Sequence, residues 1–276
     1  MRISVRAIAK RCAMTSVLNE LAQAARERVA VQQEALPIGE LRSRARSLAC
    51  ADGFPFERAL SGPGMSFICE CKKASPSKGL ISESFPYLQI AREYEQAGAN
   101  ALSVLTEPTR FLGSDAYLSE IAATVAVPCL RKDFTVDAYM VYQAKLLGAQ
   151  AILLICSILD DGQLKEFIAL ADELGMSALV EAHDEREVNR ALRAGARIVG
   201  VNNRNLVDFS VDFRNCLRLR DMVPPEVLFV AESGVSEPSQ VRELEDHGVN
   251  AVLVGEALMR AADKRAALSA LRGEPL

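Results

Sequence analysis

The stretch GAQAILLI (148–155) contains the local pattern that decides the fold. An amphipathic segment ends at Gly148, and glycine adopts the left-handed conformation of a helix C-terminus without steric cost. A continuous apolar run follows, which is typical of a parallel strand covered on both faces. The same arrangement recurs at Gly98 before ALSVL, Gly175 before ALVEA, Gly195 before RIVGV and Gly248 before AVLVG.

Counting such runs predicts eight strands, at 66–71, 101–105, 128–132, 151–155, 178–182, 197–201, 227–231 and 251–255. Amphipathic segments such as YLQIAREYEQAG (87–98) fill the gaps between them. Eight strand–helix units in about 210 residues predict an α/β fold of the (β/α)8, or TIM barrel, type. A doubly wound sheet is the structural alternative, but the turn KKASPSKG after the first strand lacks that fold's glycine-rich fingerprint.

The chain before the first strand is predicted to be a helical extension, and we expect a single domain overall. Residues 15–64 form the helical segment that caps the barrel, 65–276 form the barrel, and 56–64 are a connector. The cap covers the barrel bottom or reaches the active-site rim, and the sequence leaves both open. Residues 1–14, with four basic side chains and no acid, are a basic N-terminal extension or a start-site artefact before Met14.

Composition narrows the function classes. The chain has 276 residues, 50% of them hydrophobic and 25% charged, which provides a core and excludes a disordered protein. A net charge of -4 argues against a nucleic-acid partner, and no apolar run reaches the roughly 18 residues of a membrane span. Seven cysteines without metal-type spacing favour reduced thiols and a cytoplasmic protein without a metal.

Reactive groups of this fold lie where strands end, so polar residues there are candidates. Strand alternation places Glu70 and Lys72 on the barrel-facing side of the first strand, with Cys69 and Cys71 on the other. Two opposite charges facing the barrel predict a role in the site. The alternative is an ion pair that only fixes the barrel mouth.

Later strands end in further candidates. Lys132 offers an ammonium for general-acid or electrostatic catalysis, unless it extends to solvent. Glu181 offers a general base, unless it is only a structural partner of Lys132. Asn202 and Arg204 can orient hydroxyls and a carboxylate, although turn formation alone would explain the asparagine.

Small residues after the seventh and eighth strands predict a phosphate site. Ser233, Gly234, Gly255 and Glu256 leave room for backbone N–H groups to approach a phosphate, as in many TIM barrels. The two histidines are weaker candidates. We interpret both as structural, with His183 in a surface loop and His247 at a helix C-terminus.

Taken in order, the motifs of this chain resemble those of the indole-3-glycerol phosphate synthases. The resemblance covers nearly all of the chain from about residue 15. The motifs are ECKKASPSKG (70–79), LTEPTRFLGS (105–114), LRKDF (130–134), VEAHDE (180–185), GVNNRNL (200–206), VAESGVS (230–236) and GEALMR (255–260). Each is weak alone, but the ordered set is highly specific.

The resemblance implies a reaction of tryptophan biosynthesis. An enzyme of this family closes the ring of 1-(2-carboxyphenylamino)-1-deoxyribulose 5-phosphate and releases CO2 and water. Lys132 matches the general acid and Glu181 the general base. Lys72 matches a second active-site lysine, while Glu70 and Asn202 match residues that hold the reacting groups.

The resemblance also implies how the substrate binds. Arg204 would hold the anthranilate carboxylate, and Ser75 joins the phosphate site. Phe111, Phe134 and Leu206 match the apolar walls for the aromatic ring. No cofactor is implied, and the small-molecule substrate is the expected partner, without nucleic acid or membrane. The residues leave the oligomeric state open, with a monomer as the working expectation.

Departures from the family pattern and rival functions remain. Cys69 and Cys71 stand where other residues are common, and Asn205 stands where the family commonly has Asp. The nearest rival is a phosphoribosylanthranilate isomerase-like barrel with a strand-one cysteine as base. A Schiff-base aldolase using Lys132 and a non-catalytic phosphate-binding barrel are the others.

Overall fold

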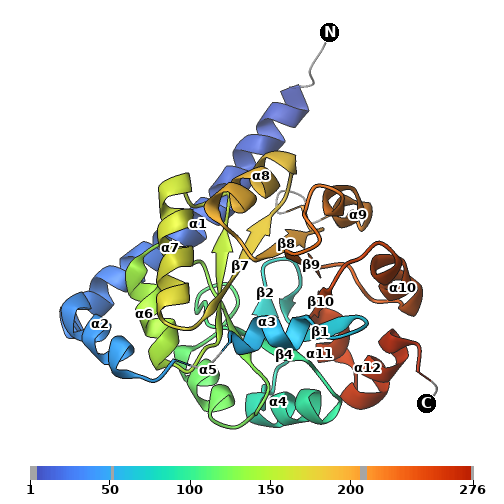
Figure 1. Ribbon diagram of the computed structural model, residues 1–276, viewed down its shortest axis with the longest axis horizontal. Coiled ribbons are helices and arrows are strands. Elements are labelled where there is room, and N and C mark those ends of the chain that lie inside the picture. The colour runs from blue at the N-terminus through green and yellow to red at the C-terminus, as the bar shows by residue number, and fades with distance from the viewer. Residues whose placement is uncertain (1–4, 51–52, 206–209, 275–276) are drawn as a thin grey trace.

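Eight parallel strands form a closed barrel in the computed structural model (Figure 1). The structure describes residues 5–50, 53–205 and 210–274, with the backbone alone over 5–16. Each strand pairs with the next along the chain, and the first and last pair to close the barrel. The strands are β1 (Ser66–Cys71), β4 (Ala101–Leu105), β5 (Cys129–Lys132), β6 (Ala151–Ile155), β7 (Ser177–Ala182), β8 (Ile198–Asn202), β9 (Leu228–Glu232) and β10 (Ala251–Val254).

The prediction of a (β/α)8 barrel is confirmed, and each predicted strand is observed to within one residue at either end. Every residue of β1, β4, β6, β7 and β10 is buried. That burial explains why the strands are continuous apolar runs instead of alternating ones. The five glycines that mark predicted helix ends all have positive φ, between 70° at Gly175 and 90° at Gly195.

Helices surround the barrel on its outer face (Figure 1). They are α4 (Tyr87–Gln96), α5 (Asp115–Ala122), α6 (Ala138–Leu146), α7 (Asp161–Glu173), α8 (Glu185–Ala194), α9 (Arg214–Arg220), α10 (Pro238–Asp246), α11 (Glu256–Arg260) and α12 (Lys264–Arg272). Side-chain caps begin several of them: Ser114, Asp137, Asp160 and Asp184 each accept a hydrogen bond from the first turn. In the described part of the chain, no helix is both long and apolar enough to span a bilayer.

The N-terminal helices answer the question of where the extension packs. Helix α1 (Val5–Ala35) reaches the active-site end of the barrel, where its residues Val17, Leu18 and Leu21 line a cavity. The helix starts at Val5, so the predicted boundary between residues 14 and 15 falls inside it. Helix α2 (Ile38–Ser47) packs against α6.

The bottom of the barrel is covered by α3 (Pro55–Leu60), which lies over its centre in Figure 1. The prediction of a connector over 56–64 is wrong for its first half. Proline at the first helical turn and the buried side chains of Phe56 and Leu60 favour a helix there. Glu57 accepts a hydrogen bond from Ser177 at the start of β7, which fastens α3 to the strand ends.

Two short strands in the loop after β1 were not predicted. Strands β2 (Ala74–Ser75) and β3 (Gly79–Leu80) form an antiparallel hairpin. Two-residue strands are too short for an alternating pattern to show in the sequence. The hairpin projects Ser75, Pro76 and Ser77 into the wall of the cavity.

Candidate active site

A cavity of about 410 Å³ opens at the C-terminal ends of the strands. Every predicted site residue in the described part of the chain lines it, and Leu206 lies outside the described residues. Those lining residues are Glu70, Lys72, Ser75, Phe111, Phe134, Lys132, Glu181, Asn202, Arg204, Ser233, Gly234, Gly255 and Glu256. Parallel strands bring residues distant in sequence to one rim, which explains why the ordered motifs converge.

Lys132 occupies the centre of the cluster. Its Nζ lies 3.3 Å from Oε2 of Glu181 and 3.4 Å from Oε2 of Glu232. The Lys132 side chain is only 16% exposed, so the alternative of a lysine that extends to solvent is wrong. A buried ammonium next to two carboxylates can donate a proton to a group placed in the cavity.

The charges in this cluster shift one another's proton affinities. Burial alone would lower the pKa of Lys132, but the carboxylates of Glu232, Glu181 and Glu70 outweigh it and raise that pKa above the usual range. Burial would likewise raise the pKa of Glu181, but Lys132, His183 and Asn202 outweigh it and lower it. Lys132 is therefore held protonated and Glu181 ionised, as an acid and a base require.

Glu232 belongs to the cluster, although it was not among the predicted site residues. Burial, with repulsion from Glu181 and Glu70, raises its pKa to about 8 against the attraction of Lys132. Its Oε1 is buried without a hydrogen-bond partner in the described part of the protein. Gly200 makes room for it, since a Cβ there would lie 2.3 Å from that oxygen. Its place at the end of β9 was the signal that could have identified it.

Strand β1 supplies the second lysine. Lys72 forms an ion pair with Glu70, and both face the cavity as strand alternation predicted. Gly255 allows this approach, because a Cβ there would lie 2.5 Å from Oε1 of Glu70. Cys69 and Cys71 are fully buried on the opposite side, where burial raises the pKa of the Cys69 thiol to about 12. A thiol so reluctant to ionise is a poor base, which disfavours the isomerase reading.

Apolar side chains form the wall near β5. The rings of Phe111 and Phe134 lie 6.1 Å apart, tilted by 42°. Leu18 and Leu21 of α1 also line the cavity, which no motif of the sequence indicated. The wall suits an aromatic ring.

Backbone turns form the opposite end of the cavity. Ser233 and Gly234 both have positive φ, 65° and 82°. A Cβ on Gly234 would lie 2.2 Å from the side chain of Val211, so only glycine fits. The carboxylate of Glu256 is paired with Lys78 at 3.5 Å and with Arg260 at 3.2 Å, which offsets its charge at this end of the cavity.

A second network holds α1 against the end of β5. Asp133 is buried and accepts hydrogen bonds from Nη2 of Arg28 at 2.8 and 2.7 Å, and from Thr106 at 2.7 Å. Arg131 and Arg28 outweigh burial and lower the pKa of Asp133. Because Asp133 lies between Lys132 and Phe134, the network fixes the backbone that carries both.

His183 is not where the sequence placed it. The prediction of a surface loop is wrong, because the ring is 21% exposed and packs between two carboxylates. Two residues beyond Glu181, the chain turns back toward the cavity before α8 begins. His247 is exposed at the C-terminal end of α10, as predicted.

Comparison with known proteins agrees with the motifs. The sequence model of the indole-3-glycerol phosphate synthases matches residues 18–271. An indole-3-glycerol phosphate synthase of Ruminiclostridium cellulolyticum is 52% identical over 257 residues, covering 93% of this chain and 99% of the relative. One of Leuconostoc mesenteroides is 51% identical over 260 residues, covering 94% and 99%.

Solved structures support the fold alone. A 3-hexulose-6-phosphate synthase aligns with a TM-score of 0.62 and 18% identity, over 76% of this chain and 99% of that one. A tryptophan synthase complex from Pyrococcus furiosus aligns with a TM-score of 0.56 and 17% identity, over 75% and 98%. The resemblance seen in the motifs is thus confirmed, and the chain belongs to the indole-3-glycerol phosphate synthase family, carboxy-lyases of tryptophan biosynthesis.

Proposed function

We propose that this cavity converts 1-(2-carboxyphenylamino)-1-deoxyribulose 5-phosphate into indole-3-glycerol phosphate, with Lys132 as general acid and Glu181 as general base. The observation that carries the proposal is the position of Lys132 Nζ, 3.3 Å from Glu181 Oε2 in a largely buried cluster. The same groups would be a costly arrangement if they served stability alone.

We expect the substrate to lie in the cavity with its phosphate and its aromatic ring at different ends. Its phosphate lies against the backbone of Gly234 and Gly255, with Ser75, Ser233 and Glu256 around it and Arg260 as a cation. Its aromatic ring lies against Phe111 and Phe134. That orientation places the ketone, which lies between ring and phosphate, near Lys132.

The remaining polar residues hold the groups that react. Arg204 and Lys72 meet the carboxylate of the ring, and Glu70 and Asn202 orient the ammonium groups and the sugar hydroxyls. Asn202 Nδ2 lies 3.4 Å from Oε1 of Glu181 and so also orients the base. Leu206 is assigned to the apolar wall from its motif alone.

The chemistry follows as a balanced sequence. The ring carbon bearing the carboxylate attacks the ketone carbon while the ketone oxygen takes a proton from Lys132. The C–CO2 bond then breaks and returns its electron pair to the ring. Finally the new hydroxyl takes a second proton from a lysine and leaves as water, as Glu181 removes one proton from the intermediate. Two protons are donated and one is removed, so each turnover takes one proton from solvent.

The proposal needs no metal or cofactor, because a protonated electron-rich ring can lose CO2 unaided. It includes a monomer working in the cytoplasm, and it keeps the division into an extension (1–14), a helical cap (15–64) and a barrel (65–276). Arg28 of α1 bonds to Asp133 at the end of β5, which supports a cap that takes part in the site.

The test is direct. Purified enzyme mixed with the carboxyphenylamino-deoxyribulose phosphate should give a rise in indole fluorescence together with release of CO2. Fluorescence without CO2 release, or intact substrate in the presence of folded protein, would contradict the proposal. Trapping of Lys132 by borohydride with a ketone substrate would favour the aldolase reading instead.

A further inference from the structure

His183 lies between two carboxylates at the edge of the active site. Its Nε2 is 3.4 Å from Oε1 of Glu181, and its Nδ1 is 3.1 Å from Oε2 of Glu187. The two ring nitrogens thus face different acids, one inside the cavity and one on α8.

The side of the ring near α8 is firmly held. Oε2 of Glu187 accepts hydrogen bonds from the backbone N–H of His183 at 2.9 Å and contacts its ring nitrogen. Glu187 itself is fixed by the N-cap of α8, where its N–H donates to Asp184 Oδ1 at 2.9 Å. Asn215 donates to the backbone carbonyl of His183 at 3.2 Å. The orientation of the imidazole is therefore determined by residues outside the cavity.

The side of the ring near Glu181 is unsatisfied. Nε2 of His183 is buried and makes no hydrogen bond in the described part of the protein. The two oxygens of Glu181 are divided between neighbours: Oε2 faces Lys132, and Oε1 faces His183 and Asn202. An unbonded nitrogen at 3.4 Å from the proposed base is placed to bond when the substrate closes the site, since catalytic hydrogen bonds often tighten on binding.

We propose that His183 is the positioning residue of Glu181: held by Glu187, it faces the base as a charge partner. The inference rests on the proposed role of Glu181 as the general base. It adds a Glu187–His183–Glu181 chain to the site.

The burial of Glu181 shows why such a partner is useful. Its side chain is only 3% exposed, so water does little to stabilise its charge. The imidazolium of His183 faces Oε1 of Glu181, while Lys132 faces Oε2, so each oxygen of the base has its own cation.

The charges around the ring support an imidazolium paired with Glu181. Burial would lower the pKa of His183, but the hydrogen bond to Glu187 and the carboxylates of Glu181, Glu187 and Glu232 outweigh it and raise that pKa. Lys132 from β5 and Glu232 from β9 also face the Glu181 side of the cluster. The His183 charge in turn contributes to lowering the pKa of Glu181.

The test compares the pH profile of kcat/KM for the wild type and the His183→Asn variant of the full chain. Without its cationic partner Glu181 holds its proton to higher pH, so the acid limb should move up by about one unit. At a pH below that limb, the kcat/KM of the variant should be about ten-fold lower than that of the wild type, which corresponds to one pKa unit. KM should change little, and added imidazole should restore part of kcat.

Two further variants make the result decisive. Glu187→Gln keeps an acceptor for the ring but removes the charge, so the acid limb should move in the same direction by a smaller amount. It serves as the second test if His183→Asn does not fold, as judged by near-ultraviolet circular dichroism. His247→Asn, at the exposed end of α10, should leave the profile unchanged.

A Glu181→Gln variant separates the two levels of the account. If it is inactive while His183→Asn and Glu187→Gln keep the wild-type acid limb, the inference is overturned and the base assignment stands. If Glu181→Gln turns over normally, the base role and the inference are both wrong. If the acid limb rises in His183→Asn and Glu187→Gln and Glu181→Gln is inactive, the result supports both the base role of Glu181 and the inference about His183.

Discussion

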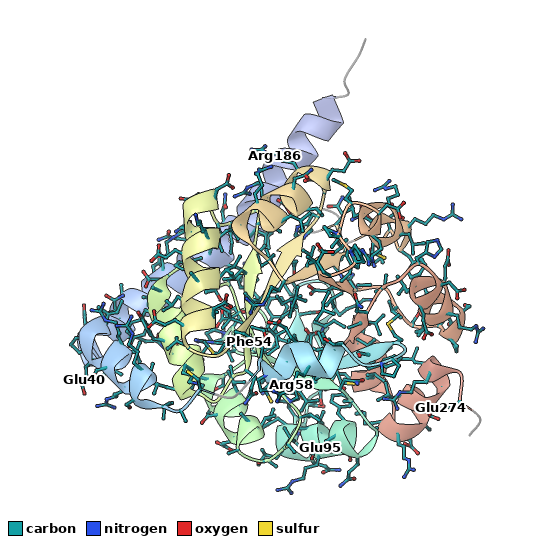
Figure 2. All side chains as sticks on the ribbon, viewed as in Figure 1. Glu40, Phe54, Arg58, Glu95, Arg186 and Glu274 are labelled. Carbon is teal, nitrogen blue, oxygen red and sulfur yellow. The ribbon has the colours of Figure 1, made fainter. Side chains whose placement is uncertain are left out.

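The two ends of the barrel both carry clustered charges, but they hold them in different ways. At the bottom, Arg197 bridges two acids: its Nη2 lies 2.8 Å from Glu57 Oε1, and its Nη1 lies 2.7 Å from Asp172 Oδ2. Its guanidinium also lies 4.3 Å from the ring centre of Phe54, which is labelled beside α3 in Figure 2. At the top, Lys132 lies 3.3 and 3.4 Å from its carboxylates, and an oxygen of Glu232 has no hydrogen-bond partner in the described part of the protein.

The difference separates stability from chemistry. In the bottom network, the charged groups lie close together and each makes hydrogen bonds to its neighbours. The network therefore fastens α3 to the N-terminal ends of β7 and β8. In the top cluster, an oxygen of Glu232 has no hydrogen-bond partner in the described part of the protein, and the pKa values of the charged groups are shifted. Both features are typical of groups that act on a bound substrate. Changes at the top should therefore affect turnover, and changes at the bottom should affect unfolding.

Lys132→Met should have the largest effect. The substitution removes the proposed acid while keeping the length of the side chain, so kcat should fall by about 10³-fold or more. Substrate binding should persist, and the quenching of protein fluorescence during a titration with substrate measures it. A variant that turns over at a rate near the wild type would refute the acid role of Lys132.

Gly234→Val should come next. Gly234 has a φ of 82°, and a Cβ there would lie 2.2 Å from Val211, so a β-branched side chain must displace the turn that we propose binds phosphate. Loss of charge-assisted hydrogen bonds to phosphate should raise KM by about 10- to 100-fold. Circular dichroism should show a folded barrel, and normal substrate affinity would show that the phosphate site is wrongly placed.

Arg197→Ala should leave kcat unchanged and lower the free energy of unfolding by about 1 to 2 kcal/mol, because it removes the cation that bridges Glu57 and Asp172 and leaves Glu57 with Ser177 alone. Urea unfolding measures this effect. The matched control is Arg46→Ala, which removes an exposed ion pair with Glu173 and should cost less than about 1 kcal/mol. If the two variants lose equal amounts of unfolding free energy, the bottom network stabilises the protein no more than an exposed ion pair does.

Glu232→Gln should have the smallest effect, visible in the pH dependence of stability. The raised pKa of about 8 means that the folded protein keeps a proton which the unfolded chain releases near its ordinary value of 4.5. Stability from the neutral carboxyl is therefore complete at low pH and is lost as the pH rises through about 8. The Gln variant lacks this loss, so its melting temperature should rise relative to the wild type as the pH increases. A constant difference between the two proteins across that range would contradict the raised pKa.

The sequence predicted the features that depend on hydrophobic periodicity and on position at a strand end. Apolar runs after glycine identified the strands, and strand ends identified Lys132 and Glu181, because those signals are local. It did not predict the roles of Leu18 and Leu21, or the pairing of Arg28 with Asp133, because both depend on how α1 packs against the barrel.

Two residues show how a local signal can mislead. Glu232 ends a strand like Glu181, but its burial beside Gly200 and its shifted pKa depend on neighbouring strands. His183 follows a strand and was assigned to solvent, because nothing in the sequence shows that the turn brings its ring back to Glu181.

The most direct test measures kcat and the free energy of unfolding together for Lys132→Met and Arg197→Ala. The account predicts a contrast in turnover between two folded variants: Lys132→Met loses kcat, while Arg197→Ala keeps kcat and has a lower free energy of unfolding. If Lys132→Met instead retains turnover, or if Arg197→Ala loses it while remaining folded, the assignment of chemistry to the top and stability to the bottom is contradicted.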